Sequence, residues 1–288
     1  MGTRDTFHMW LQIIGKVRLK QTPPINHSWH STLYVTSRGL TTSLIPHGEH
    51  AFEIHLDLID HRLSITSSDG RVAGFPLEAQ TVAVFYRKLM DELTRLDLPV
   101  RVVVQPNEVL DPIPFPRDVV HKDYDADAVN RFWRMLVQAQ RVMTQFRARF
   151  IGKCSPVHLF WGAMDLAVTR FSGRTAPPHP GGIPHLPDPI TREAYSHEVS
   201  SCGFWPGTPP IGYPAFYAYA YPEPAGFADA PVGPEGAFYS PDFREFVLPY
   251  DRVRESKTPD DTLLQFLQST YEAAANLAKW DRPALEQS

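Results

Sequence analysis

The sequence has few cysteines, no long hydrophobic run and no cluster of basic residues. Its only cysteines are Cys154 and Cys202, too few for a disulfide framework, so we expect a reducing compartment and, by default, the cytoplasm. Lys and Arg never occur in runs longer than a pair, and 28 basic residues stand against 32 acidic ones, so we expect no nucleic-acid binding. Charged residues interrupt the opening stretch MGTRDTFHMWLQIIGKVRLK, so we expect neither a signal peptide nor a membrane span.

Several motifs of well-known enzyme classes are also missing. The chain has no Gly-rich phosphate loop, no Gly-x-Ser-x-Gly nucleophile elbow and no dinucleotide fingerprint. Nucleotide-dependent chemistry therefore has no support in the sequence, and we expect no cofactor of that kind.

The composition is that of a folded protein. With 288 residues, of which 43% are hydrophobic, the chain is long enough for one large domain or two smaller ones around a packed core. Its pattern divides into two halves without a flexible linker, at residues 1–122 and 123–288, and the second half carries the candidate site.

The first half begins with apolar residues at helical spacing and then changes to strand-like runs. Phe7, Trp10 and Leu11 lie on one face of a helix that Pro23-Pro24 ends. Short β-rich runs between residues 30 and 75, broken by glycines, predict an antiparallel meander. The spacing then predicts a helix over 82–96 and a short strand at 99–104, PVRVVV, before a Pro-rich loop that runs to about residue 121.

The second half repeats this order. A long helix is expected from about residue 126 to 150, followed by strands within 157–172, 195–204, 215–222 and 244–250 and by a last helix over about 259–279. Of the 28 prolines, 15 lie between Pro177 and Pro241, which predicts stiff, irregular loops there. Long loops inside a compact domain are usually functional or disordered.

Together these patterns predict an α+β fold with two antiparallel β-meander sheets, each flanked by helices. An internal duplication is one explanation of the repeated order, because Phe75-x-Leu77 before one helix is echoed by Phe246-x-Leu248 before another. His30 and His158 are also expected at equivalent places, each on the first strand after the leading helix of its half. The alternative is coincidence among a few apolar positions.

Several long motifs resemble a known family. These are SPVHLFWGAMDLAVTRFSGR at 155–174, YSHEVSSCGFWPG at 195–207, LQFLQSTYEAAANLAKWDR near the end, RGLTT at 38–42 and HLDLIDHRL at 55–63. They are similar to a bacterial family known as domain of unknown function 5996, over nearly the whole chain. The resemblance implies a bacterial source and a soluble protein, but it implies no activity and no catalytic residue.

The segment from Cys154 to Arg174 carries the densest group of chemically useful side chains. In one unbroken strand, His158 and Arg170 would lie on one face and Trp161 and Asp165 on the other, but Gly162 makes a break there plausible. Two arrangements stay open: Asp165 orients the imidazole of His158, or Asp165 forms a structural ion pair with Arg170.

Two further pairs of residues are candidates for ligand binding and for proton transfer. Arg170 and Arg174 suit an anion, since a guanidinium forks onto a carboxylate or phosphate; the alternative for Arg174 is that it clamps the start of the Pro-rich loop through backbone carbonyls. His197 next to Glu198 offers proton transfer, although either residue is equally able to serve as a hydrogen-bonded structural group. A polar strand of this kind is not expected to be buried on both faces.

The clearest alternation in the chain is AFYAYAYP at 215–222. Phe216 and the alanines share one face and suit the underside of a helix, whereas Tyr217, Tyr219 and Tyr221 face the other way. With Trp161 and Trp205 they predict a pocket wall for an aromatic or planar ligand, unless they line an interface between the halves.

A transition metal is an alternative to a site without a cofactor. The pairs His27-x-x-His30 and His47-x-x-His50 have a weak metal-ligand spacing. A tetrahedral set is conceivable from four more distant residues, Cys154, His158, His197 and Cys202. No Cys-x-x-Cys motif supports it.

Three functional hypotheses follow. The first is an enzyme acting on a small, anionic, partly aromatic molecule in a cleft between the halves, with His158, Asp165, His197 and Glu198 as acid–base residues. The second is a protein that binds or senses a small molecule without chemistry. The third is an interaction module that uses the Pro-rich loops. The oligomeric state stays open.

Overall fold

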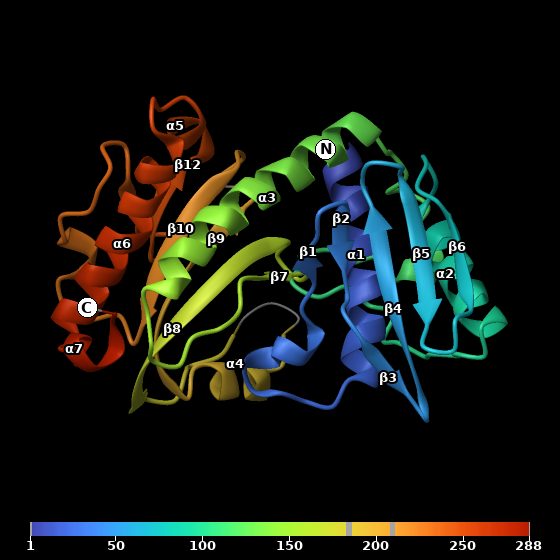
Figure 1. Cartoon of the computed structure of the whole chain (residues 1–288), viewed down its shortest axis with the longest axis horizontal. Coiled ribbons are helices and arrows are strands. Elements are labelled where there is room, and N and C mark those ends of the chain that lie inside the picture. Colours follow the sequence, from blue (N-terminus) through green and yellow to red (C-terminus); the bar gives the residue numbers. More distant parts are fainter. Residues whose placement is uncertain (1, 183–185, 208–210, 288) are drawn as a thin grey trace. The chain divides into compact units, whose positions relative to one another are not determined.

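The computed structural model describes residues 2–182, 186–207 and 211–287, which fold as an α+β protein with two antiparallel six-stranded sheets (Figure 1). This confirms the predicted fold class. The chain divides into two compact units, the first made of residues 1–137, 159–164 and 182–190 and the second of residues 138–158, 165–181 and 191–288.

The first sheet has the strand order β1-β2-β4-β5-β6, with β3 paired to β4. Its strands are β1 (Tyr34–Val35), β2 (Gly39–Thr41), β3 (Ile45–His47), β4 (His50–Asp57), β5 (Arg62–Ser67) and β6 (Val72–Pro76). Along β4, the apolar residues Phe52, Ile54 and Leu56 are buried and alternate with more exposed neighbours. This period of two directs one face of the sheet into the core.

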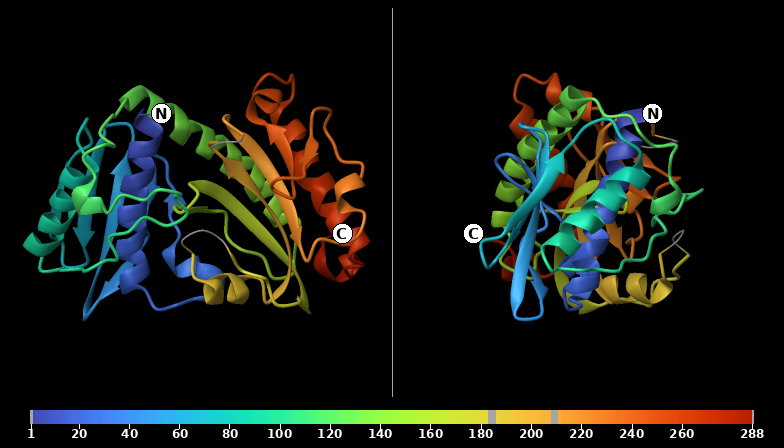
Figure 2. Two further views of the ribbon diagram at one scale, coloured as in Figure 1. Left: turned by 180° about the vertical axis from the view of Figure 1, so that it is seen from behind. Right: turned by 90° about the vertical axis from the view of Figure 1, so that its right-hand side faces the viewer.

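Two helices, α1 (Gly2–Gln21) and α2 (Val82–Arg95), lie against one face of the first sheet (Figures 1 and 2). The ring of Trp10 stacks on Phe85 with centroids 4.6 Å apart, and Phe75 meets Phe85 edge-on at 5.4 Å. The N-terminus of α2 is capped by Thr81, whose hydroxyl accepts the Val84 N–H. Both helices confirm the sequence prediction.

Two predictions in the first half are wrong. Residues 99–104 are extended but pair with no strand of the described residues, because the ladder of the first sheet ends at β6 without them. His30 lies in a 3-10 helix, η1 (Asn26–Ser31), rather than on a strand, so it is not equivalent to His158.

The second sheet has the order β11-β12-β10-β9-β8-β7. Its strands are β7 (His158–Phe160), β8 (Asp165–Thr175), β9 (His197–Trp205), β10 (Ala215–Tyr221), β11 (Phe238–Ser240) and β12 (Glu245–Pro249). Four of them, β8, β9, β10 and β12, lie side by side in antiparallel register.

The expectation that β9 is not buried on both faces was wrong, since every residue from Val199 to Phe204 is buried. The buried Ser201 hydroxyl has a polar partner there, the hydroxyl of Thr169 at 2.9 Å.

One face of this sheet is covered by helices α3 (Ala126–Ala148) and α6 (Pro259–Leu277). Phe146 of α3 meets Tyr271 of α6 edge-on at 6.2 Å, and Phe216 and Ala218 of β10 are buried on the same face. The remaining helices are short: η2 (Phe115–Arg117), α4 (Asp188–Ala194), η3 (Phe227–Asp229), α5 (Tyr250–Arg254) and α7 (Arg282–Leu285).

The Pro-rich stretch contains ordered elements between its loops. It includes α4, β9 and β10, while residues 183–185 and 208–210 within it lie outside the described residues. Whether the repeated helix–sheet–helix order arose by duplication stays a prediction.

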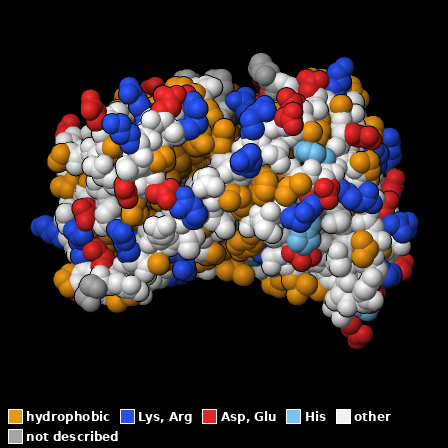
Figure 3. All heavy atoms as spheres, turned by 45° about the horizontal axis from the view of Figure 1, so that its top comes forward, with side chains coloured by type: hydrophobic (Ala, Val, Ile, Leu, Met, Phe, Trp, Pro, Cys, Tyr) orange, Lys and Arg blue, Asp and Glu red, His pale blue; other side chains and the backbone are white. Residues whose placement is uncertain are grey.

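Two surface properties bear on function. Acidic and basic side chains are interspersed on the face drawn in Figure 3. None of the described helices combines the length and the apolar character that a bilayer crossing requires.

Candidate functional site

The segment from Cys154 to Arg174 forms two strands rather than one. A turn over Trp161–Met164, in which Met164 has a φ of 60°, separates β7 from β8. The break expected at Gly162 is therefore present. His158 is fully buried on β7, whereas Asp165 starts β8.

Five side chains of the second unit form what we name the acid–phenol cluster: Asp165, Tyr195, Tyr217, Tyr219 and Glu245. The Tyr217 hydroxyl donates to the Asp165 carboxylate at 2.5 Å, and the hydroxyls of Tyr195 and Tyr219 are 2.8 Å apart. The rings of Tyr217 and Tyr219 are nearly parallel, at 14°, with centroids 6.2 Å apart. Glu245 comes from β12, two residues before Val247, the partner of Tyr217.

Strand register explains why these residues meet. Tyr217, Gly203 and Ala167 lie opposite one another on β10, β9 and β8, and Asp165 is two residues before Ala167 on the same face. A Cβ added to Gly203 would lie 2.5 Å from the phenol oxygen of Tyr217. The missing side chain of Gly203 thus leaves the space in which the Tyr217 ring crosses β9 to reach Asp165.

The surroundings of the cluster favour uncharged carboxyl groups. Burial raises the pKa of Asp165 to about 6, although the hydrogen bond from Tyr217 opposes the shift. Burial, together with the nearby charge of Asp165, raises the pKa of Glu245 to about 8. Near neutral pH the two carboxyl groups therefore differ in protonation.

The phenols are held in their neutral form. Burial raises the pKa of Tyr219 to about 12 and raises the pKa values of Tyr195 and Tyr217 well above their usual range. All five residues of the cluster nevertheless keep partial solvent contact. Within the described ranges, neither Asp165 nor Glu245 forms an ion pair with a basic side chain.

A histidine borders the cluster. The ring of His179 stacks on Tyr195 with centroids 4.8 Å apart and lies 4.9 Å from that of Tyr221. The Gly181 N–H donates to Nδ1 of His179 at 3.0 Å, and the Tyr221 hydroxyl donates to the Pro177 carbonyl at 2.9 Å. The aromatic surface therefore continues from Tyr219 to His179.

Arg170 has a structural environment on the opposite, helix-covered face. It is 1% exposed, and its guanidinium carbon lies 3.5 Å from the ring centroid of Phe146 and 4.2 Å from that of Tyr271. It also donates to the Phe146 carbonyl. The hydrogen bond to Asp165 thus comes from Tyr217 and not from either of the two expected partners, His158 or Arg170.

Arg174 and Glu198 form an ion pair with each other. The Nε and Nη2 atoms of Arg174 donate to one Glu198 oxygen at 2.9 and 2.7 Å. Arg174 also donates to the carbonyls of Ala278 and Lys279, just past the end of α6, at 2.6 and 3.2 Å. It therefore ties β8, and through Glu198 the start of β9, to the end of that helix, rather than clamping the Pro-rich loop considered from the sequence.

Three other predicted site residues make contacts outside the cluster, although Trp205 pairs with Ala215 and therefore lies on the same sheet face as Gly203 and Tyr217. His197 is exposed, and its Nδ1 is 3.1 Å from the Ser196 hydroxyl. Trp161 belongs to the first unit, where its Nε1 donates to the Ser31 carbonyl at 2.8 Å. Trp205 meets Phe243 edge-on at 5.8 Å. At the cluster the structure thus brings together Asp165, Tyr217 and Tyr219, with the ring centroid of Tyr221 5.1 Å from that of Tyr195, and elsewhere it pairs Arg174 with Glu198.

Sequence reasoning missed Glu245 and His179 and left Tyr195 out of the site. Glu245 was detectable in principle, because it alternates with Val247 in a predicted strand. His179 lies outside regular strands, in a stretch whose path no periodicity reveals. Tyr195, predicted as the first residue of a strand over 195–204, lies in a turn before β9.

The described residues contain no group of three or more His, Cys, Asp or Glu side chains arranged to hold a metal ion. The set of Cys154, His158, His197 and Cys202 is therefore not assembled there. Both cysteines are free thiols.

Comparison with known proteins identifies a family but no activity. No curated protein and no solved structure is significantly similar to the chain. The model of the Family of unknown function (DUF5996) matches residues 1–287. The match covers both sheets and all five residues of the acid–phenol cluster, and the chain therefore belongs to this family of unknown function.

Proposed function

We propose that the acid–phenol cluster binds a small molecule that carries a protonated amine beside an aromatic or other flat apolar group. The observation that carries this proposal is that Asp165 and Glu245 share one sheet face with Tyr217, are partly exposed, and have no basic partner in the described structure. Two neighbouring carboxyl groups with raised pKa values gain most from a ligand that supplies the missing positive charge.

The phenols suit the same ligand. Tyr217 and Tyr219 present nearly parallel rings beside the carboxyl groups. Aromatic faces attract cations, and hydroxyl groups accept hydrogen bonds from an ammonium group. A flat apolar part of the ligand would extend over Tyr195 toward His179.

The proposed ligand has the opposite charge to the one that the sequence favoured. Arg170 is buried among aromatic rings, and Arg174 is paired with Glu198, so both guanidinium groups have structural partners. An anionic ligand at the cluster would instead meet the ionised carboxylate of Asp165, which repels it at neutral pH.

Three probes of similar shape test the proposal: 2-phenylethylamine, 2-phenylethanol and phenylacetate. We expect the amine to raise the melting temperature and to bind with release of protons, seen in calorimetry as a heat that depends on the buffer. Asp165→Asn and Glu245→Gln should each weaken amine binding, whereas Asp242→Asn, at an exposed site, should not. Preferential binding of phenylacetate, or equal binding of all three probes, would contradict the proposal.

Acid–base catalysis at the same cluster is a second candidate. The pKa values of about 6 for Asp165 and about 8 for Glu245 leave one carboxyl group ionised and the other protonated at neutral pH. Such a pair supplies a general base and a general acid. Turnover of a bound amine that stops in Asp165→Asn, while binding persists, would favour an enzyme over a binding protein.

A further inference from the structure

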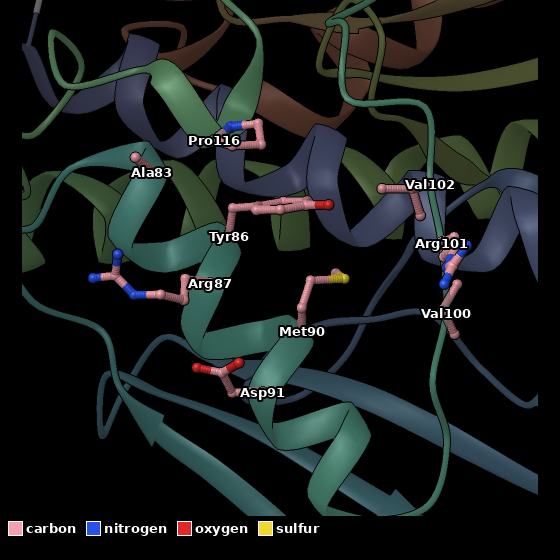
Figure 4. A pocket seen from close by; sticks show the side chains of 9 residues that line it. All are labelled: Ala83, Tyr86, Arg87, Met90, Asp91, Val100, Arg101, Val102 and Pro116. Carbon is pink, nitrogen blue, oxygen red and sulfur yellow. The ribbon is translucent and has the colours of Figure 1, made fainter.

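The first unit contains a groove between α2 and the extended segment 99–104, which we name the α2 groove (Figure 4). It has a volume of about 570 Å³. Tyr86 and Met90 of α2 form one side, and Val100 and Val102 form the other. The volume lies within the usual range of ligand sites, roughly 300–1,000 Å³.

The wall formed by residues 100–103 has the character of a strand without a neighbour. Three of its four residues are β-branched, and its side chains alternate, with Val100 buried and Arg101 exposed. Among residues 2–182, 186–207 and 211–287, no group accepts a hydrogen bond from the backbone N–H of any of these four residues. Pairing begins only at Val104, whose carbonyl accepts the Phe115 N–H at 3.0 Å.

The rim of the groove is basic. Arg87 and Arg101 are exposed at opposite sides, and in the described part of the chain neither forms an ion pair or hydrogen bond. Asp91, one turn after Arg87, contributes one negative charge. The two guanidinium groups therefore leave a net positive rim around an apolar floor.

We propose that the α2 groove binds an extended, acidic segment of a partner protein, which adds as a strand to residues 100–103. The free N–H and C=O groups of the wall would pair with the peptide backbone, as in other cases of strand addition. In an extended peptide, alternate side chains point to opposite faces, so apolar residues would enter the groove over Tyr86 and Met90. Acidic residues between them would meet Arg87 and Arg101.

The unpaired backbone distinguishes this occupant from a small amphipathic carboxylate. An acid with an apolar tail would satisfy the floor and the arginines but would leave the row of backbone groups at 100–103 unused. A peptide uses the floor, the charges and the backbone together.

The test uses the full chain and a short synthetic peptide in which valine and glutamate alternate, with a valine–lysine peptide for comparison. We expect saturable binding of the acidic peptide only, weakened by roughly tenfold or more in Arg87→Glu and Arg101→Glu. Arg134→Glu, a charge reversal at an exposed site of α3 outside the groove, should leave the affinity unchanged.

A second probe tests strand addition itself. N-methylation of alternate residues keeps the side chains and charge of the acidic peptide but removes the N–H groups on one edge. When the free edge is methylated, binding should persist. When the paired edge is methylated, binding should be lost. The complex should also slow hydrogen exchange at the amides of residues 100–103.

Three results would overturn the proposal: equal binding of both methylated peptides, unchanged exchange at residues 100–103, or binding of dodecanoate without binding of the acidic peptide. None of them depends on the acid–phenol cluster. Asp165→Asn should bind the peptide normally.

Discussion

Gly203 and Tyr217 share one space on the second sheet. A side chain at Gly203 would lie 2.5 Å from the Tyr217 ring and 2.3 Å from the carbonyl oxygen of Leu166. Because Gly203 on β9 carries a hydrogen atom in place of a side chain, the phenol from β10 has room to reach the carboxylate on β8.

Gly203→Ala should therefore displace Tyr217 and destabilise the protein by about 1–3 kcal/mol, the usual range for overpacking. Urea unfolding measures the loss, and weaker binding of 2-phenylethylamine would report the displaced phenol. Gly212→Ala is the matched control, because no atom of the described residues lies within 4 Å of a Cβ added there. Equal stability of the two variants would show that Tyr217 has room to move.

Tyr217→Phe should raise the pKa of Asp165 above its value of about 6, because the hydrogen bond from the hydroxyl stabilises the charged carboxylate. Carbon NMR of the labelled carboxyl group during a pH titration measures the shift. Tyr239→Phe, which removes a hydrogen bond to Glu223 instead, should leave Asp165 unchanged. A lower pKa in Tyr217→Phe would contradict the geometry.

Asp165 and Glu245 should make the protein less stable as the pH rises. Their pKa values are raised in the folded state, from 3.8 to about 6 and from 4.5 to about 8. Folding therefore takes up protons between about pH 4 and 8, so protonation of the two carboxyl groups favours the folded state. This contribution to the free energy of unfolding is complete below the unfolded-state pKa values and is lost as the pH rises through the folded-state values.

Glu245→Gln copies the protonated form of Glu245 and should remove part of this dependence. We compare the free energy of unfolding of the variant with that of the native chain. From roughly pH 5 to pH 8.5, the difference should shift in favour of the variant by about 1 kcal/mol or more. Urea unfolding at both pH values gives the difference. Parallel stability curves for the two proteins would mean that Glu245 titrates as in the unfolded chain.

Arg170 should tolerate methionine better than lysine. Its guanidinium is buried against Phe146 and Tyr271 and, among the described residues, has no carboxylate partner. Lysine keeps the buried charge but loses the flat contact, so we expect a loss of about 2 kcal/mol or more, against about 1 kcal/mol or less for methionine. The melting temperatures of the two variants, measured by thermal unfolding, show which substitution costs more stability. The reverse order would reveal a requirement for positive charge on this face.

The two cysteines should differ in reactivity. Cys202 is 4% exposed, and burial raises its pKa to about 12, whereas Cys154 keeps more solvent contact despite a raised pKa. Because the thiolate is the nucleophile, iodoacetamide should alkylate Cys154 first in the folded protein. Peptide mass spectrometry follows both sites, and urea should remove the difference. Faster modification of Cys202 would contradict the burial of β9.

Much of the architecture follows from local pattern. The spacing of Trp10 and Phe85 on their helices, and the alternation along β4 and β10, are properties of short segments, so the sequence predicts these elements directly. The strand at 99–104 was predicted wrongly because β-branched residues show a tendency to extend but not the presence of a neighbour.

The site depends on pairings that no local pattern contains. The alternation along the strand predicts that Tyr217 and Tyr219 lie on one face. The hydrogen-bond partner of Asp165, however, is set by the register of three strands. Sequence reasoning considered only charged partners for Asp165, whereas the structure supplies a phenol. Arg170 looked like an anion anchor because the helices that bury it come from distant parts of the chain.

The register of β10 has a consequence for how the folding of this protein can be followed. A slip of one residue would turn Tyr217, Tyr219 and Tyr221 toward the helices and bring Phe216 and Ala218 to the other face. Only the native alignment places Tyr217 and Tyr219 on the sheet face of Asp165 and Glu245, where burial raises the pKa of both phenols. The ultraviolet absorbance of tyrosinate at alkaline pH is thus an intrinsic optical gauge of strand alignment, which needs neither a label nor a ligand.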